Sequence, residues 1–224
     1  MGGGVPRSLS VAGPRFGGVL ISARESSRIL ASYGVPRQQS RRALLVGLAG
    51  PAVRTGGVLL YDEARVRGLA RWAPVDHDEL MAASPGGVLV VRLGRGMEPG
   101  DDWPWDRRVE ACRRQPEIAL IAWLQIRAHL RTCGRLACVV TVCGFPVLLA
   151  DLVRFDPDGA GNVNLGLERP GDWSLVLEER RLVTSPGPSW LLLGSQPYLG
   201  RAARARERGE RVGAGRSTVW GRWA

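Results

Sequence analysis

The clearest alternation of apolar and polar positions lies between residues 22 and 72, where apolar side chains recur at helical spacing. Ser22 followed by Glu25 fits a capping box, in which each side chain satisfies a free backbone amide at the start of a helix. Leu30 belongs to a face of apolar and small residues along this segment. Gly34 ends the segment, since glycine tolerates the left-handed conformation of the C′ position. The pattern predicts a first helix between Ser22 and Gly34.

A second helix is predicted from Gln38 to Leu48. Pro36, just before it, suits the start of a helix because the amide hydrogen that proline lacks would be unpaired there. At 3.6 residues per turn, Ser40, Leu44 and Leu48 share one face. The polar side chains roughly opposite are Gln38, Gln39 and Arg42, with Arg41 on the flank. Such a helix is chemically fit to contact DNA, because Arg pairs bidentately with guanine and Gln with adenine.

Two short strands are predicted on either side of Gly56-Gly57, because paired glycines allow the positive φ angles of a two-residue hairpin turn. Asp62 then caps a third helix, whose buried stripe contains Val66, Leu69 and Ala70. The order helix, turn, helix, hairpin, helix is that of a winged helix-turn-helix. In this interpretation the hairpin is the wing, and Arg54 on it is the expected phosphate contact.

Several short motifs follow one another in this region: Arg28-Ile29-Leu30, Gly34-Val35-Pro36-Arg37, Arg41-Arg42-Ala43-Leu44-Leu45 with Gly47, Val53-Arg54-Thr55-Gly56-Gly57 and Leu60-Tyr61-Asp62. Together they resemble the winged helices of the MerR and excisionase type, over about a quarter of the chain. The resemblance implies DNA binding through the second helix and the wing. The chain departs from the pattern at Pro36, where a hydroxyl cap is usual, and at Ser40, where an apolar residue usually packs.

Beyond residue 86 the pattern changes to short apolar runs separated by turn residues. A strand is predicted at 88–93, and helices at 106–114 and 116–131, the second beginning at Pro116. The later strands are predicted at 136–142, 147–155, 163–167, 173–177, 182–183 and 190–193. Strands at this spacing favour an antiparallel meander. We therefore expect an α+β domain with two helices against one face of an antiparallel sheet.

The expected organisation of the chain has five parts. In order, they are a Gly- and Pro-rich leader (1–18), the winged helix-turn-helix (19–72), a linker with one short helix (73–86), the α+β domain (87–196) and a basic tail (197–224). The tail contains many arginines and almost no aliphatic residues, so it is expected to be disordered and to add non-specific attraction to phosphates. The fold class is α+β throughout.

The charge of the chain changes this picture only through its location. The 224 residues have a net charge of +10, which favours polyanionic partners. All 31 basic residues are arginine, however, a bias that a GC-rich genome produces by default. Between Ser22 and Trp72 there are nine arginines against three acids, a local charge of +6. The concentration in this region therefore carries more weight than the total.

The apolar segments of the sequence bear on the cellular compartment of the protein. No run of about 18 apolar residues is present, so no transmembrane helix and no membrane partner are expected. The N-terminal residues lack the continuous apolar region of a signal peptide. Cytoplasmic residence is the resulting expectation, and the cysteines would be reduced thiols there.

One cluster of potential zinc ligands is present: His129, Cys133, Cys138 and Cys143. The gaps of three, four and four residues do not form the paired Cys-x2-4-Cys knuckles usual in structural zinc sites. Cys138 and Cys143 also have opposite parity along a strand. Thiols that pack as small apolar groups are favoured over a metal site.

The segment from Asp156 to Asn162 begins like a calcium-binding loop. Ala160 and Leu167 occupy its fifth and twelfth positions, where acidic or amide ligands are needed. A hairpin turn explains the same residues, and the isolated glycines elsewhere lack the context of a phosphate-binding loop. No cofactor and no metal are predicted.

Catalytic chemistry finds no support in the sequence. The only histidines, His77 and His129, stand outside any nucleophile motif. The acid pair Asp101-Asp102 is better explained as part of a solvated loop. We expect a protein that is not an enzyme.

The prediction is a DNA-binding protein that reads the major groove of double-stranded DNA with its second helix, as a bacterial transcriptional regulator or a mobile-element accessory factor. The predicted DNA-binding residues are Arg37, Gln38, Gln39, Arg41, Arg42 and Arg54. The α+β region would serve dimerisation, giving a homodimer, or effector sensing. Two alternatives stay open: a protein-interaction adaptor without a nucleic-acid role, and a small-molecule sensor in the α+β domain.

Overall fold

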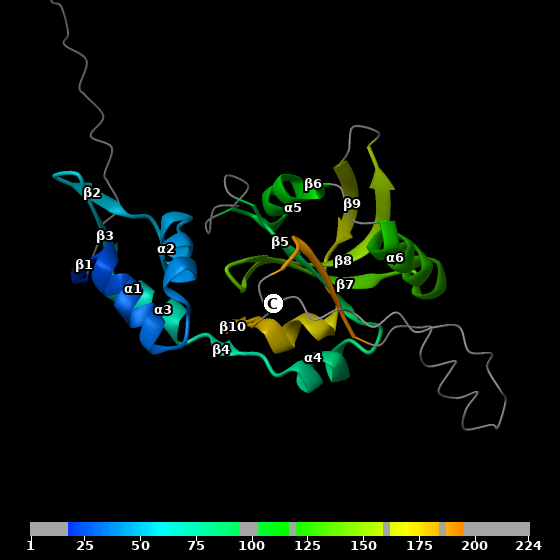
Figure 1. Cartoon of the computed structure of the whole chain (residues 1–224), viewed down its shortest axis with the longest axis horizontal. Coiled ribbons are helices and arrows are strands. Elements are labelled where there is room, and N and C mark those ends of the chain that lie inside the picture. Colours follow the sequence, from blue (N-terminus) through cyan, green and yellow to red (C-terminus); the bar gives the residue numbers. More distant parts are fainter. Residues whose placement is uncertain (1–17, 95–102, 117–119, 159–161, 184–186, 195–224) are drawn as a thin grey trace, which may run out of the picture. The chain divides into compact units, whose positions relative to one another are not determined.

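The computed structural model describes residues 18–94, 103–116, 120–158, 162–183 and 187–194. The chain divides into two compact units, with the division in sequence between Ala73 and Pro74 (Figure 1). Both units contain helices and strands, so the mixed α+β class is confirmed. The predicted leader, except for its last residue, and the predicted tail lie outside the described residues. None of the helices in the described ranges has the length and apolar character needed to cross a membrane.

The first unit consists of three helices and a three-stranded antiparallel sheet. Its elements in order are β1 (Leu20–Ser22), α1 (Ala23–Ser32), α2 (Arg37–Leu45), β2 (Val53–Thr55), β3 (Val58–Asp62) and α3 (Glu63–Ala70). The strand order is β1-β3-β2, and α1 packs against both α2 and α3. The largest fully buried side chains of this unit are Leu30, Val35, Tyr61 and Val66.

The local signals predicted for this region are present. The Ser22 side chain accepts a hydrogen bond from the Glu25 amide at 3.2 Å and so caps α1. Gly34 has a φ of +79°, which ends the helix as expected. Gly56 and Gly57 have φ angles of +55° and +81° and form the turn between β2 and β3. Asp62 caps α3 by accepting from the Arg65 amide at 3.1 Å.

Two features of the first unit differ from the prediction. Leu20 to Ser22 form a strand that pairs with β3, in the register Ile21 with Tyr61. In addition, α2 ends at Leu45 rather than Leu48, because the chain turns at Gly47, which has a φ of +83°. Pro36 is the N-cap of α2 and precedes its first helical residue.

The second unit is built on a six-stranded mixed sheet with the order β11-β5-β7-β8-β9-β6. Its elements are β4 (Ala73–Pro74, at the boundary), α4 (His77–Ala83), β5 (Val88–Arg92), α5 (Trp105–Arg113), β6 (Arg114–Pro116), α6 (Leu120–Cys133), β7 (Leu136–Val142), β8 (Phe145–Pro157), β9 (Asn162–Glu168), the 3-10 helix η1 (Asp172–Leu177), β10 (Arg180–Arg181) and β11 (Trp190–Leu193). β10 pairs with β4 in a separate two-stranded sheet.

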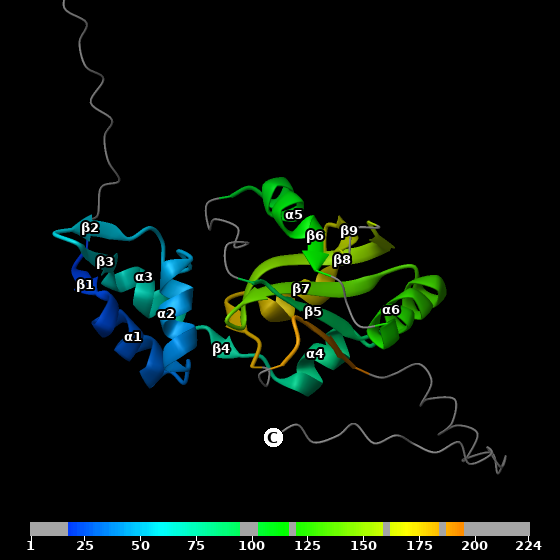
Figure 2. The same cartoon turned by 45° about the horizontal axis from the view of Figure 1, so that its top comes forward.

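The core of the second unit lies on the sheet strands. On one face, α4 and η1 lie side by side (Figure 2). Leu80 on α4 and Leu177 on η1 pack on Val88, Val90 and Val139. Helix α5 packs against β8 and β9, and α6 packs against β7 and β8. The sheet curves strongly, since the Phe155 ring on β8 lies 5.9 Å from the Trp190 ring on the edge strand β11.

Four predictions for the second unit are wrong. The sheet is mixed rather than antiparallel, because β5 and β7 pair in parallel across a crossover that contains α5 and α6. Pro116 ends strand β6 instead of starting a helix, which is compatible with the edge position of β6. The run 173–177 forms the 3-10 helix η1 rather than a strand, with Trp173 donating to Asp151 at 2.7 Å. The predicted strand 182–183 is replaced by β10 just before it.

The stretch expected to be a linker contributes to the second unit. Its predicted short helix is α4, capped by Asp76, whose side chain accepts from the amides of the next helical turn. Leu80 on this helix is 1% exposed and belongs to the core. Residues 75–86 therefore pack as part of the second unit.

Candidate functional site

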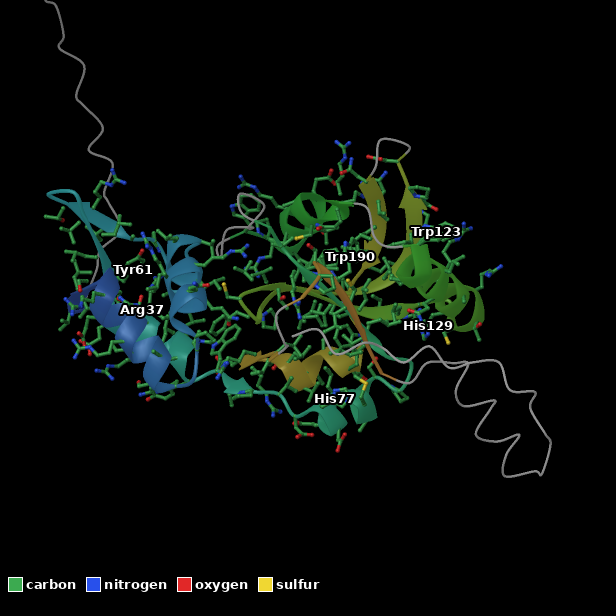
Figure 3. All side chains as sticks on the ribbon, in the orientation of Figure 1. Arg37, Tyr61, His77, Trp123, His129 and Trp190 are labelled. Atoms are coloured by element: carbon green, nitrogen blue, oxygen red, sulfur yellow. The ribbon has the colours of Figure 1, made fainter. Side chains whose placement is uncertain are left out.

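The surface of α2 carries the strongest candidate site. Its exposed residues are Arg37, Gln38, Arg41 and Leu45, which form one stripe along the helix. Gln39 and Arg42, which were predicted to face outward with them, are half-buried. The outward face of α2 is therefore centred closer to Arg41 than the sequence predicted. The label of Arg37 marks the N-terminal end of this stripe in Figure 3.

The opposite face of α2 fixes its rotation. Ser40 is fully buried, and its hydroxyl donates to the backbone oxygens of Val35 and Pro36, each at 3.1 Å. Ala43 and Leu44 on the same face are buried in the core. A buried hydroxyl satisfied in this way takes the place of the apolar residue expected at position 40, because its polar atom needs no contact with water.

The N-terminal end of α2 is electropositive. Pro36 provides no side-chain cap, and no acidic residue stands in the first turn. The amides of the first turn and the helix dipole both favour a negative charge at such an end. Arg37 adds a full positive charge at the same place.

The β2–β3 hairpin presents a second basic element. Arg54 is exposed and pairs across the hairpin with Leu59, two residues from the Gly56-Gly57 turn. At the base of this sheet Tyr61 is 1% exposed, and burial raises the pKa of its hydroxyl. The hairpin is thus anchored at one end and open to solvent at its tip.

Sequence reasoning missed one basic residue near this surface. Arg65 on α3 is exposed, and its side chain lies across Gly50, where an added Cβ would collide with it. The φ of +80° at Gly50 allows this close approach. Gly50 could be predicted from the sequence to form a turn, but no local pattern indicates that the Arg65 side chain covers it.

The three acids of the first unit lie on α1, at the last residue of β3 and on α3. Glu25 forms an ion pair with Arg28 on α1, and Glu63 pairs with Arg67 at 2.7 Å on α3. From residue 26 to residue 61 the sequence contains five arginines and no Asp or Glu. Helix α2 and strand β2 therefore contain no carboxylate, and the one carboxylate of β3, Asp62, lies at the end of the strand away from the hairpin turn and caps α3.

Charge also differs between the units. Residues 18–73 contain nine arginines and three acids, a net charge of +6. Residues 74–194 contain thirteen arginines and sixteen acids, a net charge of −3. A codon bias toward arginine acts on both regions alike, so it does not explain this separation.

The potential zinc ligands do not come together in the structure. His129 and Cys138 are buried, whereas Cys133 is exposed and Cys143 lies in the β7–β8 turn. Burial raises the pKa of the Cys138 thiol to about 12, which disfavours the thiolate that zinc needs. Within the described ranges, no group of three or more His, Cys, Asp or Glu residues is arranged to hold a metal ion.

The segment that resembled a calcium loop connects β8 and β9. The Asp158 side chain accepts from the Asn162 amide at 3.0 Å and from Arg114 at 3.0 Å, so its oxygens support the hairpin. Residues 159–161 lie outside the described residues, as does the pair Asp101-Asp102.

No protein-family model, curated protein or solved structure matches this chain.

Proposed function

We propose that the first unit is a winged helix-turn-helix that binds double-stranded DNA, with α2 as the recognition helix and the β2–β3 hairpin as the wing. The observation that carries the proposal is the exposed stripe Arg37, Gln38 and Arg41 on a helix whose other face is buried. The stripe lies in a 36-residue stretch without acids, from residue 26 to residue 61.

Size supports the fit of α2 to DNA. An α-helix with side chains is about 10–12 Å across, and the major groove of B-DNA is about 12 Å wide. In that groove Gln38 and Arg41 would meet base edges, where amide and guanidinium groups recognise adenine and guanine. Arg37, beside the electropositive end of the helix, is suited to a phosphate.

The remaining basic residues would position the unit on the backbone. Arg54 on the hairpin and Arg65 above Gly50 are exposed and can approach phosphates. Gln39 and Arg42 are half-buried, so they would support the interface rather than read bases at its centre. A protein of this kind acts as a transcriptional regulator or as an accessory factor of a mobile element, and not as an enzyme.

The test measures DNA binding by the full chain. A preferred duplex is first selected from random sequences, and its dissociation constant is measured by fluorescence anisotropy at several salt concentrations. The double variant Arg37→Ala/Arg41→Ala should bind at least tenfold more weakly. The slope of log affinity against log salt should become shallower by about 0.9 for each phosphate that the variant no longer neutralises.

A matched double variant controls for net charge. Arg113→Ala/Arg154→Ala removes the same two charges from exposed positions of the second unit. It should bind the duplex like the wild type, within about twofold. Equal weakening by both double variants, or wild-type affinity that does not depend on salt, would contradict the proposal.

A second candidate function, docking of a protein partner, is favoured by one observation. Leu45 is 60% exposed at the end of the same stripe, and an apolar side chain there is unusual for a phosphate-binding face. A Leu45 side chain in a major groove can contact the methyl group of thymine, so the residue fits DNA as well. Failure of the selection to enrich any duplex, with no salt-dependent binding, would favour the docking function.

A further inference from the structure

The second unit contains a pocket of about 340 Å³ on the sheet face that carries α4. Leu80 from α4, Leu182 and the β11 residues Leu191 and Leu193 form apolar walls. Its volume lies in the range of small-molecule sites, which are mostly apolar with a few placed polar groups.

Arg92 is the charged residue of this wall. It ends strand β5, and it shares its side of the strand with Val88 and Val90 of the core. Its backbone amide donates to Ser189 at 2.7 Å and its guanidinium donates to the Pro188 oxygen at 3.1 Å. These bonds hold the side chain beside the apolar walls, because both the backbone and the head group are tied to the segment before β11.

Burial at this position lowers the pKa of Arg92, since the surrounding protein removes water from the charged guanidinium. A half-buried cation gains more from an anionic partner than an exposed one, because the attraction is less screened. His77, the first residue of α4, also lines the pocket and offers a second nitrogen donor (Figure 3).

We propose that this pocket binds a small monocarboxylate with an apolar body, with the carboxylate on Arg92 and the body against the leucine walls. A guanidinium matches a carboxylate because it can donate two parallel hydrogen bonds to it. A phosphate ester would bring about two charges, and a single guanidinium in a mostly apolar pocket offers less compensation for them. The site stands independently of the DNA-binding proposal.

Hexanoate serves as the probe, and its binding to the full chain is measured by calorimetry and by the shift in melting temperature. Hexanoate should bind saturably, whereas hexanamide and hexylammonium, which share its body but lack the negative charge, should bind at least tenfold more weakly. Hexyl phosphate should also bind more weakly than hexanoate. Equal binding of the amide or of the phosphate ester would overturn the proposal.

Two variants locate the site. Arg92→Met keeps the length of the side chain and removes the charge, so the dissociation constant for hexanoate should rise by about tenfold or more. Val183→Trp enlarges an exposed residue of the pocket wall and should block the probe without changing the buried core.

The matched control is Arg113→Met, an exposed arginine of α5 that does not line the pocket. It should bind hexanoate like the wild type. Unchanged binding in Val183→Trp would place the probe elsewhere and overturn the proposal, even where Arg92→Met unfolds. The proposal would also be overturned if Arg113→Met weakened hexanoate binding as much as Arg92→Met does.

Discussion

His129 on α6 is a buried histidine whose protonation links the stability of the fold to pH. The residue, labelled in Figure 3, is 7% exposed, and a Cβ added at Gly86 would lie 3.1 Å from its ring. Burial lowers its pKa from the ordinary value of 6.5, and a hydrogen bond to the backbone of Arg135 opposes the shift in part. The neutral ring is therefore the form that the folded state favours.

This shift predicts a pH dependence of stability. Below pH 6.5 the unfolded chain takes up a proton on His129 before the folded chain does, so the free energy of unfolding falls as the pH drops from about 6.5 toward the lower folded pKa. Above pH 6.5 the residue contributes no pH dependence. Urea unfolding at pH 7.5 and pH 5.5, followed by tryptophan fluorescence, measures the decrease, which His129→Gln should reduce.

The other histidine provides the control. His77 is exposed at the start of α4, and His77→Gln should lose the same stability between the two pH values as the wild type. Most tryptophans of the described residues lie in the second unit, so their fluorescence follows the unit that contains both histidines. If His129→Gln and the wild type lose equal stability, the residue does not control the change.

At the scale of elements, the β2–β3 hairpin depends on two positive φ angles. Gly57→Val places a β-branched side chain at a φ of +81°, which should destabilise the first unit by about 1–2 kcal/mol. Gly56→Asn is the matched variant, because Asn tolerates a left-handed conformation and Asn-Gly is a favoured hairpin turn. Chemical unfolding followed by backbone amide NMR signals of the first unit measures both variants. Equal destabilisation by both variants would show that the turn conformation is not the cause.

Local sequence signals predicted the elements of the first unit well. The Ser22 cap and the Gly56-Gly57 turn are defined by residues that are neighbours in sequence, so one short window contains the information. Strand β1 was missed because its partner, β3, lies about 40 residues later and no periodic pattern marks three residues. The rotation of α2 was predicted only approximately, because bonds from Ser40 back to the preceding turn help set it.

The second unit was predicted less well for a related reason. Strand β6 forms because Gln115 pairs with Val163, a pairing that its own sequence, Arg-Gln-Pro, does not suggest. The parallel pairing of β5 with β7 likewise depends on a long crossover. The pocket at Arg92 could not be predicted, because its walls come from segments about a hundred residues apart.

At the scale of the whole molecule, the proposal of DNA binding depends on where the charge lies. The first unit and the predicted tail are basic, and the region between them has a net charge of −3. The tail from 197 to 224 contains seven arginines and two acids. Under the proposal, charges of this kind would attract any duplex alike, whereas the α2 stripe, on a folded surface, would distinguish sequences.

Removal of residues 197–224 from the chain separates these two contributions. Truncation should weaken binding to the preferred duplex and to an unrelated duplex by the same factor, with a shallower salt slope, because only phosphate attraction is removed. Arg37→Ala/Arg41→Ala should instead reduce the ratio of the two affinities, because base contacts add energy only for the preferred sequence. The truncation removes a net charge of +5 and the double variant only +2. If total charge alone determined binding, the truncation would weaken binding to the preferred duplex more than the double variant does. If the truncated chain bound both duplexes equally and the double variant still preferred the selected duplex, sequence recognition would belong to the tail and not to α2.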